Sequence, residues 1–123
     1  MNRQRLGAQA EQLAMRYLTE QGLSPFATNY RCRYGEIDLI MRDTTTWVFV
    51  EVRYRRHHSH GGAGASVNHC KQRKLIRATN FWLQQHGQLN SKARIDVVAM
   101  NSLNTDFSGI VWIRGAVEGD TQR

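Results

Sequence analysis

The sequence has little proline, little cysteine and no long apolar run. Among 123 residues Pro25 is the only proline, and Cys32 and Cys70 are the only cysteines, which we expect to be ordinary thiols rather than a disulfide. No apolar stretch is long enough to span a bilayer, and the first residues, MNRQRLGAQAEQ, lack the apolar core of a signal peptide. We therefore expect a soluble, cytoplasmic protein without a membrane partner.

Acidic residues are missing from residues 52–95, although the chain as a whole contains 10 Asp and Glu. The same segment holds all 5 histidines and many of the lysines and arginines of a chain with net charge +7. Such one-sided clustering is expected of a surface that contacts phosphates. The alternatives are a solvated basic face and, less consistent with the pattern, a membrane-surface helix. The candidates for phosphate contacts are Arg55, Arg56, Arg73 and Lys74.

Hydrophobic spacing and turn residues predict the secondary structure. One helix is expected over residues 5–21 and a second from an N-cap at Ser66 to about His86, each followed by a glycine stop. Apolar and β-branched segments predict strands over residues 26–33, 35–41, 47–54, 93–101 and 110–114. This order predicts one α/β domain on a mixed sheet over residues 1–116, followed by a disordered tail over 117–123.

Two acids stand within the most strand-like segments, where carboxylates are unusual. They are Asp38 in GEIDLI and Glu51 in VFVEVR. Strict alternation along a strand places Asp38 on the face opposite to Ile37 and Leu39. If the two segments pair as a hairpin in simple register, Asp38 and Glu51 project toward the same place.

Such a pair of carboxylates has two explanations. Two carboxylates brought together repel unless a cation lies between them, and Mg²⁺ is typically held by one or two carboxylates plus substrate phosphate. The alternative is an edge hairpin with charged residues on its solvent face, which hinders aggregation. The neighbouring acid-free basic segment favours the metal site, with Asp38 and Glu51 as ligands of Mg²⁺ or Mn²⁺.

Taken together, the motifs resemble a known family. The segments that carry the resemblance are GAQAEQLAMRYL, NYRCRYGEIDLI, VFVEVR, KQRKLIRATNFWL and RIDVVAM, in order from Gly7 to Met100. They make the chain similar to the YraN family of small bacterial proteins. The spacing of Asp38, Glu51 and Arg53 also resembles the PD-(D/E)XK nuclease superfamily, which includes restriction endonucleases and archaeal Holliday-junction resolvases.

The nuclease resemblance implies a fold and a set of site residues. It implies a restriction-endonuclease-like core of helix, three strands, helix and strand, with the active site at the hairpin. It further implies that Asp38 and Glu51 hold one or two Mg²⁺ or Mn²⁺ ions, and that Glu11 matches a catalytic acid that some members place on the first helix. A solvated helical glutamate explains Glu11 equally well.

One position departs from the nuclease pattern, which has lysine where this chain has Arg53. Arginine stays protonated, so it can hold a phosphate or stabilise negative charge but cannot act as a base. Lys71 on the second helix is a candidate replacement, at helical spacing with the apolar Leu75 and Trp82, and some superfamily members place their lysine there. At the edge of a buried stripe a lysine either reaches water or points into a functional cavity, and reaching water is the favoured interpretation.

Other features carry less information. The histidine run at residues 57–60 lacks the spacing of a zinc site. The glycines within residues 61–64 complete no nucleotide-binding motif, and they favour a loop that orders against nucleic acid. Trp82 is expected in the core, whereas Trp47 either stacks on a base or packs.

The sequence therefore predicts a metal-dependent endonuclease that hydrolyses phosphodiester bonds in DNA, or alternatively in RNA. Arg53 or Lys71 would stabilise the charge that develops at phosphorus. A non-catalytic nucleic-acid-binding module on the same fold is the alternative that Arg53 favours. A third hypothesis is an adaptor whose basic face meets an acidic protein. The sequence leaves open whether the active form is a homodimer.

Overall fold

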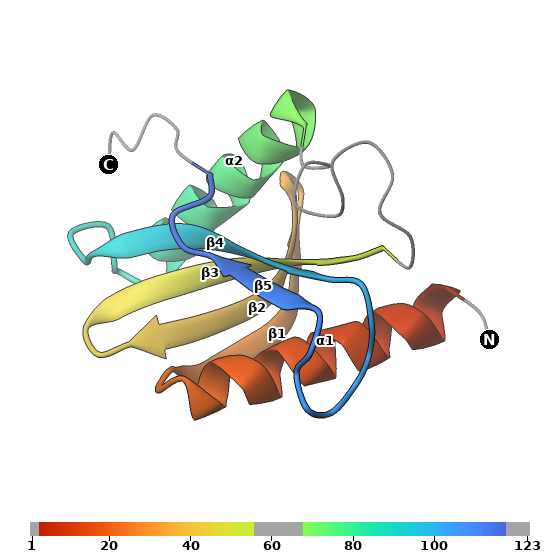
Figure 1. Ribbon diagram of the computed structural model, residues 1–123. Coiled ribbons are helices and arrows are strands. Elements are labelled where there is room, and N and C mark those ends of the chain that lie inside the picture. The colour runs from red at the N-terminus through yellow and green to blue at the C-terminus, as the bar shows by residue number, and fades with distance from the viewer. Residues whose placement is uncertain (1–2, 56–67, 118–123) are drawn as a thin grey trace.

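The computed structural model describes residues 3–55 and 68–117. This part of the chain contains the two helices and five strands that the sequence predicts. In order they are α1 (Arg3–Glu20), β1 (Ser24–Cys32), β2 (Gly35–Asp43), β3 (Thr46–Tyr54), α2 (His69–Gln85), β4 (Ala93–Met100) and β5 (Ile110–Ile113) (Figure 1).

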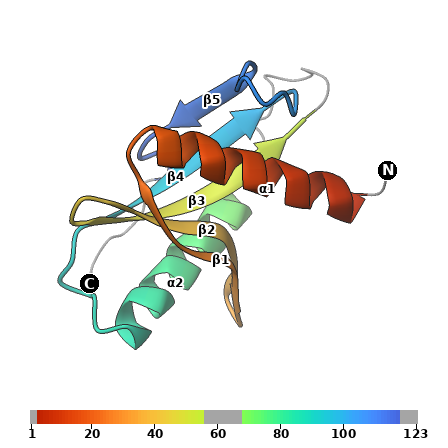
Figure 2. The same ribbon diagram turned by 90° about the horizontal axis from the view of Figure 1, so that it is seen from below.

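The strands form one sheet in the order β1-β2-β3-β4-β5. Neighbouring strands are antiparallel except β3 and β4, which run parallel. A parallel connection has to cross over the sheet, and α2 makes this crossover. α1 lies against one face of the sheet and α2 against the other (Figures 1 and 2). The predicted α/β class and mixed sheet are thereby confirmed.

An apolar stripe holds α1 on its face of the sheet. Its buried members, at the spacing of one helical face, are Ala10, Leu13, Ala14 and Leu18. They pack against side chains of β2 and β3, namely Leu39, Met41, Val48 and Val50. The first turns of α1 lie near the end of β3 (Figure 1). Burial of this stripe therefore sets which residues of α1 face the end of the sheet.

α2 covers the opposite face with Trp82 at its centre. Trp82 is 2% exposed, and its ring meets those of Trp47 and Phe49 edge-on at centroid distances of 4.7 and 5.4 Å. Trp82 is thus a core residue, as predicted. Trp47 is only 4% exposed and donates from Nε1 to Gln88, so it packs and has no open face on which a base could stack.

The start of α2 differs from the sequence prediction. The helix begins at His69, and Asn68 is its N-cap, with Oδ1 accepting a hydrogen bond from the Lys71 N–H at 2.9 Å. The predicted N-cap at Ser66 is therefore wrong. Serine and asparagine are comparable N-caps. Asn68 caps the helix because its side chain reaches the free N–H of Lys71 when Leu75 and Trp82 face the sheet.

One fully buried acid serves the fold rather than the site. Asp96 of β4 accepts hydrogen bonds from Trp112 Nε1 and Gly115 N, both at 2.9 Å, and from Arg94 Nε at 3.1 Å. These bonds attach β5 and the turn after it to the sheet. Because the buried carboxylate is satisfied by its own neighbours, we assign Asp96 a structural role.

Cys32 and Cys70 are free thiols, as predicted.

No helix within residues 3–55 and 68–117 is long and apolar enough to cross a membrane. Val117 is buried against the α2 side of the core, and the rest of the predicted tail, residues 118–123, lies outside the described residues.

Candidate active site

β2 departs from regular strand geometry at Asp38. The ladder between β2 and β3 ends at Leu39, one residue short of Asp38. On the other side, Asn29 of β1 has φ 53°, a left-handed conformation that asparagine tolerates better than most residues. Ile37 packs with the α2-side core and Leu39 with the α1-side core. The strict alternation predicted here is therefore wrong, because the strand twists at the residue between them.

The twist aims the Asp38 carboxylate into the gap between β2 and β3. Its Oδ2 accepts a hydrogen bond from the Val52 N–H at 2.8 Å, a donor that lies beyond the end of the ladder. There it meets the side chain of Glu51, which is only 3% exposed and lines the same cavity. The structure thus brings Asp38 and Glu51 together, at the place where their strands separate.

Glu11 adds a third carboxyl group from α1. It is half-buried and lines the same cavity as Asp38 and Glu51. Ala10, the preceding residue, belongs to the buried stripe of α1, which holds Glu11 at the edge of the sheet. Glu11 therefore faces the acidic pair and is not a solvated surface glutamate.

Burial and repulsion raise the pKa values of these acids. The pKa of Asp38 is raised from 3.8 to about 8, first by burial and then by the charge of Glu51, while the Val52 N–H opposes the shift. The pKa of Glu11 is also raised, first by burial, with the hydrogen bond to Asn29 opposing it. In the absence of a cation, Asp38 therefore carries a proton at neutral pH.

Two basic side chains converge on Glu51. Lys71 Nζ, from the first turn of α2, lies 2.6 Å from Glu51 Oε2, and Arg53 Nη1 lies 3.5 Å from the same oxygen. The favoured interpretation that Lys71 reaches water is wrong. Its side chain is 41% exposed, yet the ammonium group ends on the buried carboxylate, because the crossover places the start of α2 beside the end of β3. Such charge-assisted bonds are short and strong.

The acids and the two cations line one open cavity of about 460 Å³. Its walls come from the first turns of α1, the ends of β2 and β3, and the first turn of α2. The remaining lining residues are Leu6, Gly7, Ala10, Val52, Tyr54 and Arg55. A cavity of this volume, with a few convergent polar groups, is typical of a ligand-binding or catalytic site.

The predicted phosphate-binding residues are not all at this cavity. Arg55 follows β3 and lines the cavity with an exposed side chain. Arg73 is exposed on α2 and is not among the lining residues, whereas Lys74 lines a neighbouring cavity. Arg56 lies outside the described residues, as do the histidine run and the glycine segment at residues 57–64.

Sequence reasoning does not reveal two contributors to the site. Asn29 fixes Glu11 and distorts β1 next to Asp38, and an asparagine inside a strand pattern is the only signal that could have indicated it. The backbone N–H of Val52, which orients Asp38, has no sequence signal at all. Both act through backbone geometry, which residue types alone do not specify.

The side chains available as ligands decide whether a divalent cation fits this site. Among the described residues, no group of three or more His, Cys, Asp or Glu side chains is arranged to hold a metal ion. Asp38 and Glu51 still form a pair, and one or two carboxylates with water and substrate oxygens are the usual ligands of Mg²⁺. A divalent cation would also relieve the repulsion that raises the pKa of Asp38. The pair therefore fits such an ion, which would compete with Lys71 for Glu51.

Asp38→Asn is expected to raise the free energy of unfolding at alkaline pH and to leave it unchanged in acid. The pKa of Asp38 is about 8 in the folded protein and returns to about 3.8 in the unfolded chain. Between these values unfolding releases a proton, so wild-type stability falls as pH rises, and the variant lacks this loss. Each unit of pKa difference is worth about 1.4 kcal/mol, so the gain should reach several kcal/mol near pH 8. Urea unfolding across this pH range, without divalent ions, measures it.

Asp106→Asn is the matched control, because the pKa of Asp106 is shifted in the opposite direction from that of Asp38. Asp106 is exposed, and hydrogen bonds from Ser108 lower its pKa, so its replacement should not raise stability at alkaline pH. In Asp38→Asn the side-chain amide oxygen can still accept from the Val52 N–H, so that contact is retained. Parallel pH profiles for wild type and Asp38→Asn would contradict a buried acid with a raised pKa at this position.

The fold and the site define a small α/β protein with an acidic pair, the buried Glu51 and the partly buried Asp38, and a facing lysine at one end of a mixed sheet. Comparison with known proteins adds the family. Residues 10–100 match the family described as "Uncharacterised protein family UPF0102", and the chain belongs to this family. The matched segment contains the acidic cluster and Lys71.

Several similar proteins carry the name "UPF0102 protein". That of Methylobacillus flagellatus is 49% identical over 111 residues, which cover 90% of this chain and 95% of that protein. That of Aeromonas hydrophila is 49% identical over 112 residues, covering 89% of this chain and 82% of that protein. The Stutzerimonas stutzeri protein is 47% identical over 113 residues, covering 91% and 93%. The resemblance to the YraN family of small bacterial proteins is thus confirmed.

Proposed function

We propose that this protein is a metal-dependent nuclease that hydrolyses phosphodiester bonds in DNA. The observation that carries the proposal is the convergence of Asp38, Glu51 and Lys71 in one open cavity. An acid with a raised pKa that lies in a cleft beside a specific charged partner is a candidate for a functional site. Here the acids can hold a divalent cation, and an ammonium group faces them.

The order of the elements supports the relationship to the PD-(D/E)XK nucleases. The chain runs helix, three strands, helix, strand, and the two acids stand on adjacent strands where these separate. The pattern asks for a lysine where this chain has Arg53. Lys71 lies 2.6 Å from Glu51 on the other side of the cavity, so the amine can come from α2 instead. The departure at Arg53 is therefore compatible with catalysis.

A divalent cation held by Asp38 and Glu51 would polarise the phosphoryl group and lower the pKa of a water molecule. In hydrolysis the water oxygen bonds to phosphorus, one ester P–O bond breaks, and the leaving oxygen takes up a proton. The Lys71 ammonium can orient the water and stabilise the charge that builds at phosphorus, and the permanently charged Arg53 adds to this stabilisation. Glu11, whose pKa is raised, can hold a proton within the cluster.

Charge favours a nucleic acid as the substrate. The net charge is +7, and the acid-free segment at residues 52–95 supplies the basic side chains of the cavity, Arg53, Arg55 and Lys71. Arginine and lysine at the edge of a cleft hold phosphates and position the chain to be cut. The resemblance to restriction endonucleases and junction resolvases favours DNA as the substrate. RNA is included among the substrates that are tested for cleavage.

The test is cleavage of a panel of labelled substrates with Mg²⁺ or Mn²⁺. Duplex DNA, a flap, a four-way junction and RNA are each incubated with wild type, Asp38→Ala and the control Asp106→Ala. Wild type and Asp106→Ala should cut at least one DNA substrate, EDTA should stop cutting, and Asp38→Ala should be inactive. Cutting by Asp38→Ala at the wild-type rate would overturn the assignment of the site.

A non-catalytic nucleic-acid-binding module is the second candidate, and Arg53 is the observation that favours it. Arginine at the lysine position retains phosphate binding while removing a group that can exchange a proton. Under this alternative, wild type binds DNA with affinity that falls as salt rises and cuts no substrate with either metal. Arg53→Lys should then be equally inert.

A further inference from the structure

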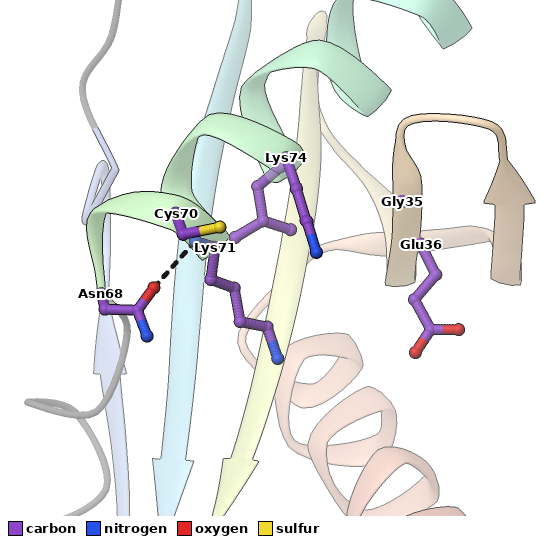
Figure 3. Close-up of a pocket in the computed structure, with 7 residues that line it drawn as sticks. Gly35, Glu36, Asn68, Cys70, Lys71 and Lys74 are labelled. Carbon is purple, nitrogen blue, oxygen red and sulfur yellow. Dashed lines mark hydrogen bonds between the residues drawn. The ribbon is translucent and has the colours of Figure 1, made fainter.

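A second cavity lies beside the candidate active site. It has a volume of about 370 Å³ and lies between the tip of the β1–β2 hairpin and the first turns of α2. Its lining residues are Gly35, Glu36, Asn68, Cys70, Lys71, Lys74 and Leu75, six of which are labelled in Figure 3. The site described above uses only one of these residues, Lys71.

Lys71 joins the two cavities. It lines both, and its ammonium group lies on Glu51 at the acidic end. Lys74 follows on the next turn of α2, and in Figure 3 its side chain extends between that of Lys71 and the hairpin that carries Gly35 and Glu36. A phosphate bound at the acidic pair and Lys71 would therefore have a second lysine, Lys74, beside it on the side away from α1.

The hairpin tip lies close to the base of the Lys74 side chain. A Cβ built on Gly35 would lie 3.4 Å from Lys74 Cβ, so the backbone of the tip packs directly against the stem of the lysine. Gly35 has φ 150°, a conformation that side chains rarely adopt, which suits a glycine at this close approach.

The charges around this cavity favour an anion. Lys74 contributes one positive group and Glu36 one negative group, and the Lys71 ammonium group, which is paired with Glu51, would add a second positive group where a divalent cation takes its place on that carboxylate. Glu36 is paired with Arg31 at 3.2 Å, and both side chains are largely exposed, so solvent and the guanidinium screen its carboxylate. Lysine ammonium groups bind phosphate as point charges.

We propose that the second cavity is a subsite for the nucleotide next to the bond that is cut, with Lys74 binding its phosphate. The proposal rests on the proposed function, and it deepens that function by naming the substrate class. The enzyme would require a polynucleotide that continues beyond Lys71, and it would act poorly on an isolated phosphodiester. The volume of the cavity, at the lower end of the range for small ligands, suits one nucleotide unit.

The test compares two substrates and two lysine variants. A labelled DNA oligonucleotide of the kind that wild type cuts is compared with bis(p-nitrophenyl) phosphate, a small diester without a neighbouring nucleotide. The ratio of kcat/KM for the two substrates is measured for wild type, Lys74→Ala and Lys92→Ala. Lys92 is an exposed lysine that directly precedes β4, at the opposite end of the sheet from Glu51. Its replacement by alanine therefore removes the same charge as Lys74→Ala, but far from the second cavity.

Lys74→Ala should lower the oligonucleotide preference about tenfold, and Lys92→Ala should leave it unchanged. Without divalent ions, Lys74→Ala should also reduce the salt dependence of oligonucleotide binding by about one unit of slope. Equal preference and equal slope for the two variants would overturn the subsite. If wild type cuts nothing, the proposed function fails, and the binding slopes still decide whether Lys74 contacts a phosphate.

Discussion

Lys71→Ala is expected to lower the rate of metal-dependent DNA cleavage by about 10²–10⁴-fold, the usual size of a proton-transfer or charge-stabilising contribution. The reason is geometric, because Lys71 Nζ lies 2.6 Å from the buried Glu51 carboxylate, whereas Arg53 lies 3.5 Å away and cannot exchange its proton. DNA affinity should change little, since Lys71 is one phosphate contact among several. Single-turnover cleavage and fluorescence anisotropy measure the two quantities separately.

Two variants control this result. Lys92→Ala removes the same charge at the opposite end of the sheet and should keep the wild-type rate. Arg53→Lys keeps a positive charge near Glu51 and should preserve both the fold and a measurable rate. If Lys71→Ala cuts as fast as wild type while Arg53→Lys loses activity, the functional cation is on β3 and not on α2.

Removal of either carboxylate is expected to abolish stabilisation of the protein by Mn²⁺. An ion present at about 100 times its dissociation constant stabilises the folded state by roughly 2.7 kcal/mol. For a chain of this length, such a gain corresponds to a rise in Tm of roughly 10 °C. Wild type should show this rise, whereas Asp38→Asn and Glu51→Gln should not. Differential scanning calorimetry with and without Mn²⁺ measures the shift, and titration calorimetry measures the binding directly.

The DNA affinity of the same variants separates metal binding from substrate binding. Each substitution removes a negative charge from the cavity, so affinity for DNA without divalent ions should hold or rise. Asp106→Asn, in an exposed turn, should retain the full Mn²⁺ shift. An undiminished shift in both carboxylate variants would place any ion elsewhere and remove the basis for a two-carboxylate site.

The sequence by itself determined the elements and their order. Apolar residues at helical spacing, such as Ala10 and Leu18, specify α1, and runs such as VFVEVR specify a strand, because periodicity decides which face can be buried. Periodicity also places Leu75 and Trp82 on the buried face of α2. The order of elements then leaves few arrangements, since two strands separated by a long helix pair in parallel. The five strands and two helices within residues 3–55 and 68–117 follow from these local properties.

Sequence also singled out Asp38 and Glu51, because a carboxylate in the middle of a strand is unusual whatever the fold. It did not determine how they meet. Simple register and strict alternation would have put them side by side on one face of a flat hairpin. In the structure the ladder ends at Leu39, and the Val52 N–H draws the Asp38 carboxylate into the gap between the strands. That bond depends on backbone geometry, which no residue type specifies.

Only the tertiary structure decided which cation faces the acids and which acid joins them. Lys71 is separated from Glu51 by twenty residues of sequence, and helical spacing alone allowed it to reach either water or a cavity. The crossover brings the first turn of α2 to the end of β3, and the ammonium then binds the carboxylate rather than water. Glu11 likewise reaches Asp38 because packing of the α1 stripe fixes the rotation of that helix. Periodicity defines faces within one element, whereas contacts between elements depend on how those faces are packed together.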